Sequence, residues 1–249
     1  MASAATTDTV LLRLYTWRVG TITIGYNQRR ESACDWTRVS DTPVIRRVTG
    51  GRALFHDPSE LTYSIALDTA AGHPSHPLNS TVSQTSRLIA HALAAFVAAA
   101  GKPVSYVRVS SSDNARPAYF HSAPCFASRA RYELADEHGK VVASAQRRIG
   151  SVLLQHGSIK LRGVAGHPAL PGVGDDAGGS ARHPISADEF SRYAALFASA
   201  AGASLDLEIA PAELDSRDID GISHCAERLS ENGLVRRDPI KQSTSDASL

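Results

Sequence analysis

Apolar residues recur along the chain at two spacings, and these spacings predict its helices and strands. Between residues 81 and 100 they return every three or four positions, which is typical of one face of a helix. Ser80 is a suitable N-cap for this helix, and Gly101 is expected to end it. A capping box at residues 186–189 predicts a second helix that runs to about Ala201.

Alternating or β-branched apolar runs predict the strands. They fall at residues 10–17, 21–26, 44–48, 61–67, 104–109, 132–135, 140–146, 151–156 and 204–209. The first two are expected to pair as a hairpin, and a turn at 136–139 is expected to pair the two strands that flank it. The polar stretch 28–39 is predicted to form a short helix, and residues 211–232 are predicted to be largely helical.

The order of these elements favours one fold class. Strands come in clusters and helices are few and separate, which predicts an α+β fold with mixed β-sheets packed with a few helices, rather than a regular βαβ repeat. Residues 10–210 are expected to form the main domain, and 211–249 a C-terminal helical extension with a disordered tail. The Gly- and Pro-rich segment 163–183 is expected to be a flexible connection.

Composition excludes several classes of protein. The chain has 249 residues, of which 43% are hydrophobic and 20% charged, as in an ordinary soluble globular protein. Because the formal net charge is +1, no nucleic-acid partner is expected. The sequence contains no apolar run of about 18 residues, and its start lacks the basic and apolar regions of a signal peptide. A cytoplasmic location without a membrane partner is therefore expected.

Three cysteines, Cys34, Cys125 and Cys225, are too widely spaced for a zinc motif or a disulfide framework, so no metal site is expected. In a reducing compartment each is a free thiol, either a small core residue or a reactive one. Cys125 follows a long polar loop and would be a nucleophile if a nearby cation lowered its pKa. Lys140 is the candidate for that cation, and a buried core cysteine is the competing interpretation.

Residues 44–56 combine three arginines with a Gly-Gly pair between apolar residues. Adjacent glycines let the backbone approach a bound group closely. Arg46, Arg47 and Arg52 supply fork-shaped donors at the same place, a combination that suits a carboxylate or a phosphate. A β-turn with a solvated basic rim is the alternative interpretation.

Residues 140–158 form a second stretch with candidate chemistry. Its first half ends in the small residues Ala143, Ser144 and Ala145, which would let a ligand lie against the strand. Its second half ends in the polar run 155–158. Two strands with such ends would form a pocket wall, whereas the alternative is an ordinary surface hairpin.

Several separated motifs, in the right order, resemble the biotin/lipoate protein ligase superfamily. The first half of the chain carries Arg46-Arg47-x-Thr49-Gly50-Gly51-Arg52-Ala53-x-x-His56 and then Glu60-Leu61-Thr62-Tyr63-Ser64. The second half resembles the lipoate branch in Cys125-Phe126, Tyr132-Glu133, Lys140-x-x-x-Ser144-Ala145-Gln146-x-Arg148 and Gln155-His156-Gly157-Ser158-Ile159. Within that branch the Cys-Phe pair is similar to that of octanoyltransferases that are ligase-like in sequence. The resemblance covers roughly residues 11–210.

The resemblance implies a fold and a set of site residues. The fold would be the α+β catalytic domain of these ligases, here residues 10–210. Cys125 would be the acyl-accepting cysteine, and Lys140 the family's lysine that lies against the acyl carbonyl and thioester. The implied substrate-binding residues are Arg46, Arg47, Thr49, Gly50, Gly51, Arg52, His56, Ser144, Ala145, Gln146, His156 and Gly157.

The resemblance also implies a reaction. Cys125 would take an octanoyl group from acyl carrier protein and pass it to a lysine of a lipoyl-domain protein, such as the H protein of glycine cleavage. This route uses no cofactor. An ATP- and Mg²⁺-dependent lipoate-protein ligase, an octanoyl or lipoyl amidotransferase, and an acyl-binding homologue without catalytic activity remain as alternatives. Acyl transfer with or without ATP would discriminate between them.

Overall fold

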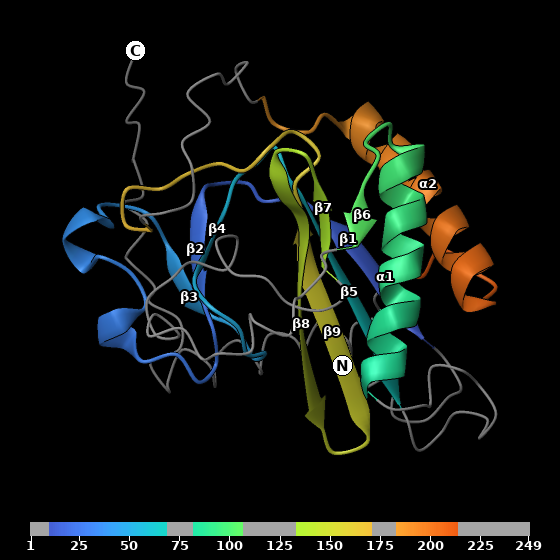
Figure 1. Cartoon of the computed structure of the whole chain (residues 1–249), viewed down its shortest axis with the longest axis horizontal. Helices are drawn as coiled ribbons and strands as arrows, with labels where there is room; N and C mark the ends of the chain where they lie inside the picture. Colours follow the sequence, from blue (N-terminus) through green and yellow to red (C-terminus); the bar gives the residue numbers. More distant parts are fainter. Residues whose placement is uncertain (1–9, 69–81, 107–132, 171–182, 214–249) are drawn as a thin grey trace, which may run out of the picture.

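The computed structural model describes residues 10–68, 82–106, 133–170 and 183–213 (Figure 1). Two β-sheets and two long helices make up this part of the chain. The six-stranded sheet has the order β1(Leu11–Tyr15), β5(Leu61–Asp68), β9(Val152–Ile159), β8(Gly139–Ile149), β7(Leu134–Asp136), β6(Ser105–Tyr106). The three-stranded sheet has the order β3(Val44–Arg46), β2(Thr21–Ile24), β4(Leu54–His56). The helices are α1(Val82–Ala99) and α2(Ala187–Leu205). The fold is therefore α+β with mixed sheet packing, as predicted.

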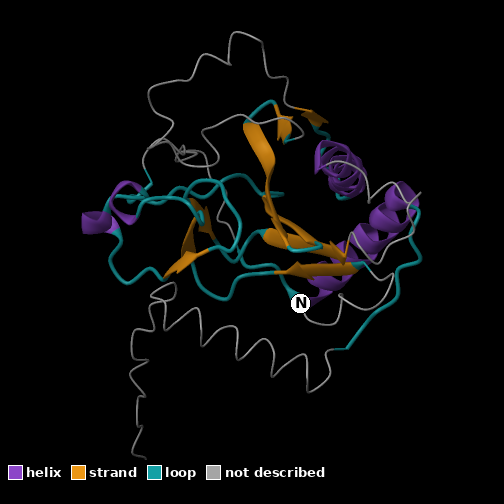
Figure 2. Cartoon of the chain, turned by 90° about the horizontal axis from the view of Figure 1, so that it is seen from below, coloured by secondary structure: helices purple, strands orange, loops and turns teal. Residues whose placement is uncertain are grey.

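The six-stranded sheet is antiparallel throughout, and both helices lie against one of its faces (Figures 1 and 2). Alternate residues of β5 point to the helices, because successive side chains of a strand face opposite sides. Tyr63 is one of them, and its ring packs against Phe197 of α2, which in turn contacts Phe96 of α1. This layer of apolar side chains forms the main core. The helices α1 and α2 leave the opposite face of this sheet uncovered, so a site can form there.

The three-stranded sheet lies beside the larger one (Figure 1). All four residues of β2 are buried, since this strand pairs in parallel with β3 and antiparallel with β4. Residues 163–170 cover this sheet, because Ala169 and Leu170 belong to its core. The expected flexible connection at 163–183 is therefore packed at its start, and residues 171–182 lie outside the described residues.

The helix ends agree with the sequence signals. Gly101 follows α1 with a φ of +90°, a left-handed conformation that glycine adopts without steric cost. Ser186 and Glu189 form the expected capping box at the start of α2. The predicted turn at 136–139 joins β7 to β8 as a hairpin. The predicted N-cap Ser80, the segment 107–109 and the chain from residue 214 onward lie outside the described residues.

Three local predictions need correction. The predicted hairpin between the first two strands is wrong, because β1 pairs with β5 and β2 belongs to the other sheet. The predicted strand at 204–209 is also wrong: α2 continues to Leu205, a buried residue of its inner face, and Asp206 caps it in the left-handed conformation. The stretch 28–39 contains two 3₁₀ turns rather than one helix. The short strand β4 was not predicted, because three residues carry too little periodicity.

Candidate active site

A cavity of about 140 Å³ lies between the two sheets. Its wall is mainly apolar and comes from both sheets and from the connections between them. The lining residues are Tyr15, Trp17, Thr23, Ile45, Arg47, Gly51, Leu54, His56, Thr62, Ala143, Ser144, Ala145, His156, Gly157 and Ser158. A largely apolar cavity with few polar groups is the ordinary form of a small-molecule site.

Strand register explains why one wall of the cavity is smooth. Ala143 is paired with Ser158, and Ser158 with Thr62, so three small side chains lie side by side across β8, β9 and β5. Gly157 leaves no room for a side chain: a Cβ there would clash with the Ala143 carbonyl oxygen and lie 2.8 Å from Cε1 of Tyr63. The packing of the three strands therefore requires glycine at position 157, and the backbone of this residue lines the cavity.

The loop between β3 and β4 forms the facing wall, and Arg47 organises it. One terminal nitrogen of Arg47 donates to the carbonyl oxygen of Thr23 at 3.0 Å and to its hydroxyl at 2.7 Å. The other donates to the carbonyl oxygens of Gly50 at 3.0 Å and Arg52 at 2.8 Å. Gly51 has a φ of +91° and faces Ala145 across the cavity. These contacts assign Arg47 a role in holding the loop shape.

Arg46 has a similar structural role outside the cavity. Its guanidinium donates to the carbonyl oxygens of Gly25 and Gln28, each at 2.8 Å, and to that of Tyr26 at 3.1 Å. Gly50 accepts a bond from Arg47, and a side chain on Gly50 would meet no neighbouring atom. Thr49 is buried, and its hydroxyl forms a short hydrogen bond to Nε2 of His156.

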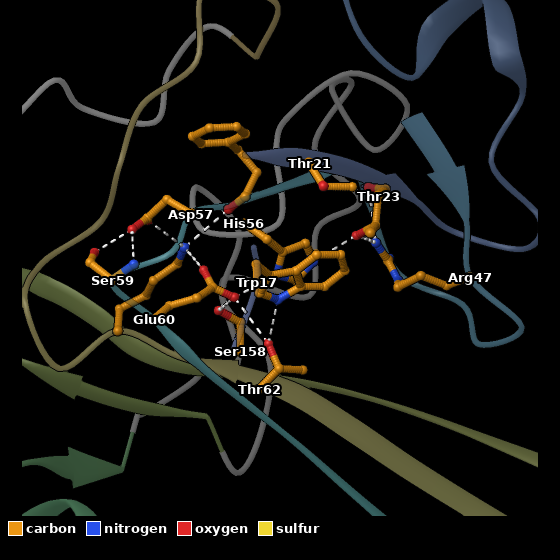
Figure 3. A network of polar contacts seen from close by, with 12 residues as sticks. Trp17, Thr21, Thr23, Arg47, His56, Asp57, Ser59, Glu60, Thr62 and Ser158 are labelled. Carbon is orange, nitrogen blue, oxygen red and sulfur yellow. Dashed lines mark hydrogen bonds and ion pairs between the residues drawn. The ribbon is translucent and has the colours of Figure 1, made fainter. Parts of the chain in front are cut away.

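A buried polar network lies behind the cavity (Figure 3). The Glu60 carboxylate is at its centre, with Oε1 at 2.5 Å from Nδ1 of His56. The Lys160 ammonium binds the other carboxylate oxygen and also donates to the Phe55 carbonyl oxygen at 3.0 Å. The hydroxyls of Thr62 and Ser158 donate to Oε1 of Glu60 at 3.1 and 3.0 Å. All these charges are buried, and each has a partner.

The charge state of the network follows from its surroundings. Burial alone would raise the pKa of Glu60, but Lys160 and His56 lower it to about 2, so this carboxyl is ionised. Burial lowers the pKa of His56 and outweighs the raising effect of Glu60, so the ring is neutral at pH 7. The neutral ring then donates from Nδ1 to Glu60 and accepts from the Thr23 hydroxyl at Nε2, at 2.9 Å.

Trp17 and His156 complete the polar edge of the cavity. The indole of Trp17 stacks on His56 and donates from Nε1 to the Thr62 hydroxyl at 2.8 Å. Burial, with the charge of Arg47 and the neighbouring His56, lowers the pKa of His156 to about 4. Both imidazoles at the cavity are therefore neutral at pH 7, and the cavity surface is uncharged at these two positions.

Lys140 lies near the end of the small-residue wall rather than among the lining residues. Its ammonium is 2.8 Å from a carboxylate oxygen of Glu133, and both side chains are buried. Ser144 bonds to the Tyr63 hydroxyl at 2.7 Å, and Gln146 donates to the Gln155 side chain. Hydrogen bonds from Gln155 and Ser144 oppose the effect of burial, which raises the pKa of Tyr63 to about 12.

The structure brings seven of the predicted site residues to the cavity: Arg47, Gly51, His56, Ser144, Ala145, His156 and Gly157. Arg46, Thr49, Gly50, Arg52, Gln146 and Lys140 lie around it without lining it. Cys125 lies outside the described residues. Tyr15, Trp17 and Thr23 line the cavity but were not predicted, because their strands carry no motif and only the meeting of the two sheets brings them there.

Within residues 10–68, 82–106, 133–170 and 183–213, no group of three or more His, Cys, Asp or Glu side chains is arranged to hold a metal ion. The helices in these ranges are also too short or too polar to cross a membrane.

The sequence is similar to that of known proteins from one family. Residues 2–165 match the family model of the lipoyl protein ligase A/B catalytic domain. The octanoyltransferase LipM of Kyrpidia tusciae is 38% identical over 152 residues, which are 60% of this chain and 54% of that protein. The chain thus spans about half the length of the curated relatives that it matches.

Solved structures share the fold at lower identity. Protein Ta0514 of T. acidophilum, solved with bound lipoic acid, has a TM-score of 0.62 at 16% identity, over 92% of this chain and 85% of that one. A lipoate-protein ligase A bound with ATP has a TM-score of 0.60 at 17% identity, with the same coverage. At these identities the likeness shows a common fold.

Proposed function

Because the chain belongs to the lipoyl protein ligase A/B catalytic domain family, we propose that it is an octanoyltransferase of protein lipoylation. The observation that carries this proposal is the apolar cavity between the two sheets, walled by the small residues Ala143, Ala145 and Gly157. A medium-length acyl chain needs an apolar slot with a smooth wall, which is what these residues provide. Relatives of 36–39% identity carry the name octanoyltransferase LipM, which supports the choice of the acyl group.

Lys140 and Cys125 carry the proposed chemistry. The Cys125 thiolate attacks the carbonyl carbon of an octanoyl thioester on acyl carrier protein. A new bond forms between this sulfur and the acyl carbon, the bond to the donor sulfur breaks, and the donor leaves as a thiolate that takes a proton from solvent. The ammonium of Lys140 stabilises the thiolate and the negative oxygen of the tetrahedral intermediate. No ATP is needed, because the thioester is already activated.

The second half of the reaction delivers the acyl group. The neutral ε-amine of a lipoyl-domain lysine attacks the octanoyl-Cys125 thioester, an amide bond forms, and Cys125 leaves as a thiolate. The amine nitrogen loses its extra proton to solvent. An H protein of glycine cleavage is the proposed acceptor. This chemistry requires a reduced thiol, which suits the cytoplasm.

A lipoate-protein ligase is the second candidate. The observation in its favour is that a solved protein of the same fold was determined with ATP. A ligase would convert free lipoate and ATP to lipoyl-adenylate with release of pyrophosphate, would then transfer the lipoyl group to a lysine amine with release of AMP, and would need no cysteine. Amidotransfer of an octanoyl or lipoyl group between protein domains, and acyl binding without turnover, are further outcomes that one experiment can separate.

That experiment is an intact-mass measurement after incubation with octanoyl-acyl carrier protein, with and without ATP and Mg²⁺. The transferase gains the mass of one octanoyl group without ATP, and Cys125→Ala does not, whereas Cys34→Ala, a matched cysteine variant, still does. Transfer that needs free lipoate and ATP would establish the ligase instead. Octanoyl-H protein used as the donor tests amidotransfer. An acylated Cys125→Ala variant would refute the nucleophile, and a folded chain that accepts no acyl group would refute catalysis.

A further inference from the structure

A buried ion pair joins Glu133, the residue before β7, to Lys140 of β8. Nζ of Lys140 lies 2.8 Å from Oε2 of Glu133, and the two side chains are 4% and 6% exposed. At this burial an ammonium is costly unless an opposite charge compensates for the lost hydration. Glu133 supplies that charge, so the pair is the local arrangement that lets Lys140 be charged inside the protein.

A β-bulge decides which face of the sheet this pair occupies. Leu134 is paired with Val142, whereas its neighbour Ala135 is paired with Lys140, so Val141 is an extra residue on β8. Leu134 and Val142 both pack in the core beneath the helices. Because adjacent residues of a strand face opposite sides, Ala135 and Lys140 face the other side.

That other side is the side of the cavity. Ala143 and Ala145 line the cavity, and they alternate with Val142 along β8. With regular alternation Lys140 would share the face of Val142 and Ser144, and its ammonium would be aimed into the helix-covered core. The bulge reverses this. Glu133 precedes Leu134 and so faces the same side as Lys140, in agreement with the observed ion pair.

We propose that Glu133 is the positioning residue for Lys140, holding its ammonium on the cavity face during acyl transfer. The inference rests on the proposed function, since it assigns Lys140 its partner in that reaction. Glu133 does not contact the acyl group; it acts through Lys140.

The charged groups around Lys140 on neighbouring strands have other partners. Lys160 follows β9, and its backbone N–H donates to the Val141 carbonyl oxygen at 2.8 Å, but its ammonium is directed to Glu60 and Asp57. Asp136 of β7 accepts from Lys102, with 2.8 Å between the charged atoms. Within the part of the chain that the structure describes, Glu133 is the carboxylate observed in an ion pair with the Lys140 ammonium.

The test compares Glu133→Gln and Glu133→Asp with Asp136→Asn in the full chain. The control removes the carboxylate of Asp136, three residues further along the chain, in an ion pair of the same 2.8 Å length that does not include Lys140. The readouts are kcat and KM for octanoyl-acyl carrier protein. Glu133→Gln is expected to lower kcat about tenfold or more with little change in KM, because the Lys140 ammonium loses the carboxylate that holds it in place.

Glu133→Asp keeps the charge and is expected to recover most of kcat, and Asp136→Asn to behave as wild type. A loss of kcat in Glu133→Gln no larger than that in Asp136→Asn, or an equal loss in Glu133→Gln and Glu133→Asp, overturns the inference. NMR of the Nζ groups of the four lysines, Lys102, Lys140, Lys160 and Lys241, tests the pairing without catalysis. Glu133→Gln should change the Lys140 signal selectively. An unchanged Lys140 signal in Glu133→Gln overturns the pairing of Glu133 with Lys140. A wild-type chain without transferase activity overturns the proposed function, and in that case the NMR signal alone tests the pairing.

Discussion

The indole ring of Trp17 lies on the imidazole ring of His56, with 4.2 Å between the ring centroids and 19° between the planes. His56 is itself fixed by Glu60 and Thr23, and Trp17 is fixed by the Thr62 hydroxyl. The cavity edge therefore has one rigid aromatic surface whose orientation depends on buried hydrogen bonds. Two consequences of this arrangement can be measured, in the fluorescence of Trp17 and in the stability of the network.

Trp17 should report ligand binding directly. The chain has two tryptophans, and Trp36 lies outside the cavity lining, with Nε1 donating to the Arg30 carbonyl oxygen. In a Trp36→Phe variant, octanoate is expected to shift the emission to shorter wavelength, because the acyl chain displaces water from the indole. The matched Trp17→Phe variant should show no shift. A response that persists in Trp17→Phe would place the bound acid elsewhere.

Glu60→Gln should be strongly destabilising. The substitution leaves the buried Lys160 ammonium without its main counter-charge, and breaking such a pair costs about 3–5 kcal/mol. Urea unfolding followed by circular dichroism measures this loss. Asp35→Asn is the control, because it removes the exposed pair with Arg38 and should change the midpoint little. Equal urea midpoints for Glu60→Gln and Asp35→Asn would contradict the role of Glu60 as the main counter-charge of Lys160.

Stability should fall on acidification in two successive windows. The pKa of His156 is about 4 in the fold and about 6.5 in the unfolded chain, so the unfolded state binds more protons between these values. The free energy of unfolding therefore decreases as pH falls from 6.5 to 4, by about 3 kcal/mol at most for this group. Glu60 adds a second decrease of the free energy of unfolding between pH 4.5 and about 2. Its pKa is lower in the folded state than in the unfolded chain, so the unfolded chain binds more protons in this range.

His156→Gln removes the first of these groups. The variant should show a shallower decrease of the free energy of unfolding between pH 6.5 and 4, measured by urea titration at several pH values. The decrease below pH 4.5 should remain, because Glu60 is unchanged. An identical slope in both proteins over the upper window would show that His156 does not titrate as its burial requires.

Gly157→Ala should disrupt the pairing of β8 with β9. The added methyl would overlap the Ala143 carbonyl oxygen and approach Cε1 of Tyr63 to 2.8 Å, and backbone atoms on a paired strand cannot move aside cheaply. A loss of about 3 kcal/mol or more is expected from thermal or urea unfolding. Gly50→Ala is the matched control for stability, since its methyl would meet no atom within 4 Å. Comparable losses in both variants would contradict the close packing at Gly157.

The sequence by itself determined the parts that depend on local signals. The apolar period of α1 and the capping box of α2 act within a few residues of the chain, and both helices begin where they were expected, although α2 continues beyond its predicted end. The small residues at 143–145 and Gly157 marked one wall of the cavity, and a side chain at position 157 would clash with the neighbouring strands. The α+β class followed from the order of these elements.

Only the tertiary structure decided which strands share a sheet and where the side chains point. Strands β1 and β2 are neighbours in the sequence but belong to different sheets, because β1 pairs with β5, about fifty residues away along the chain. The cavity that Trp17 and Thr23 line lies between these two sheets. The roles of Arg47 and Glu60 depend on carbonyls and charges contributed by distant segments. The side of the sheet that Lys140 faces depends on one bulge at Val141, and a two-residue period cannot reveal where a strand carries one extra residue.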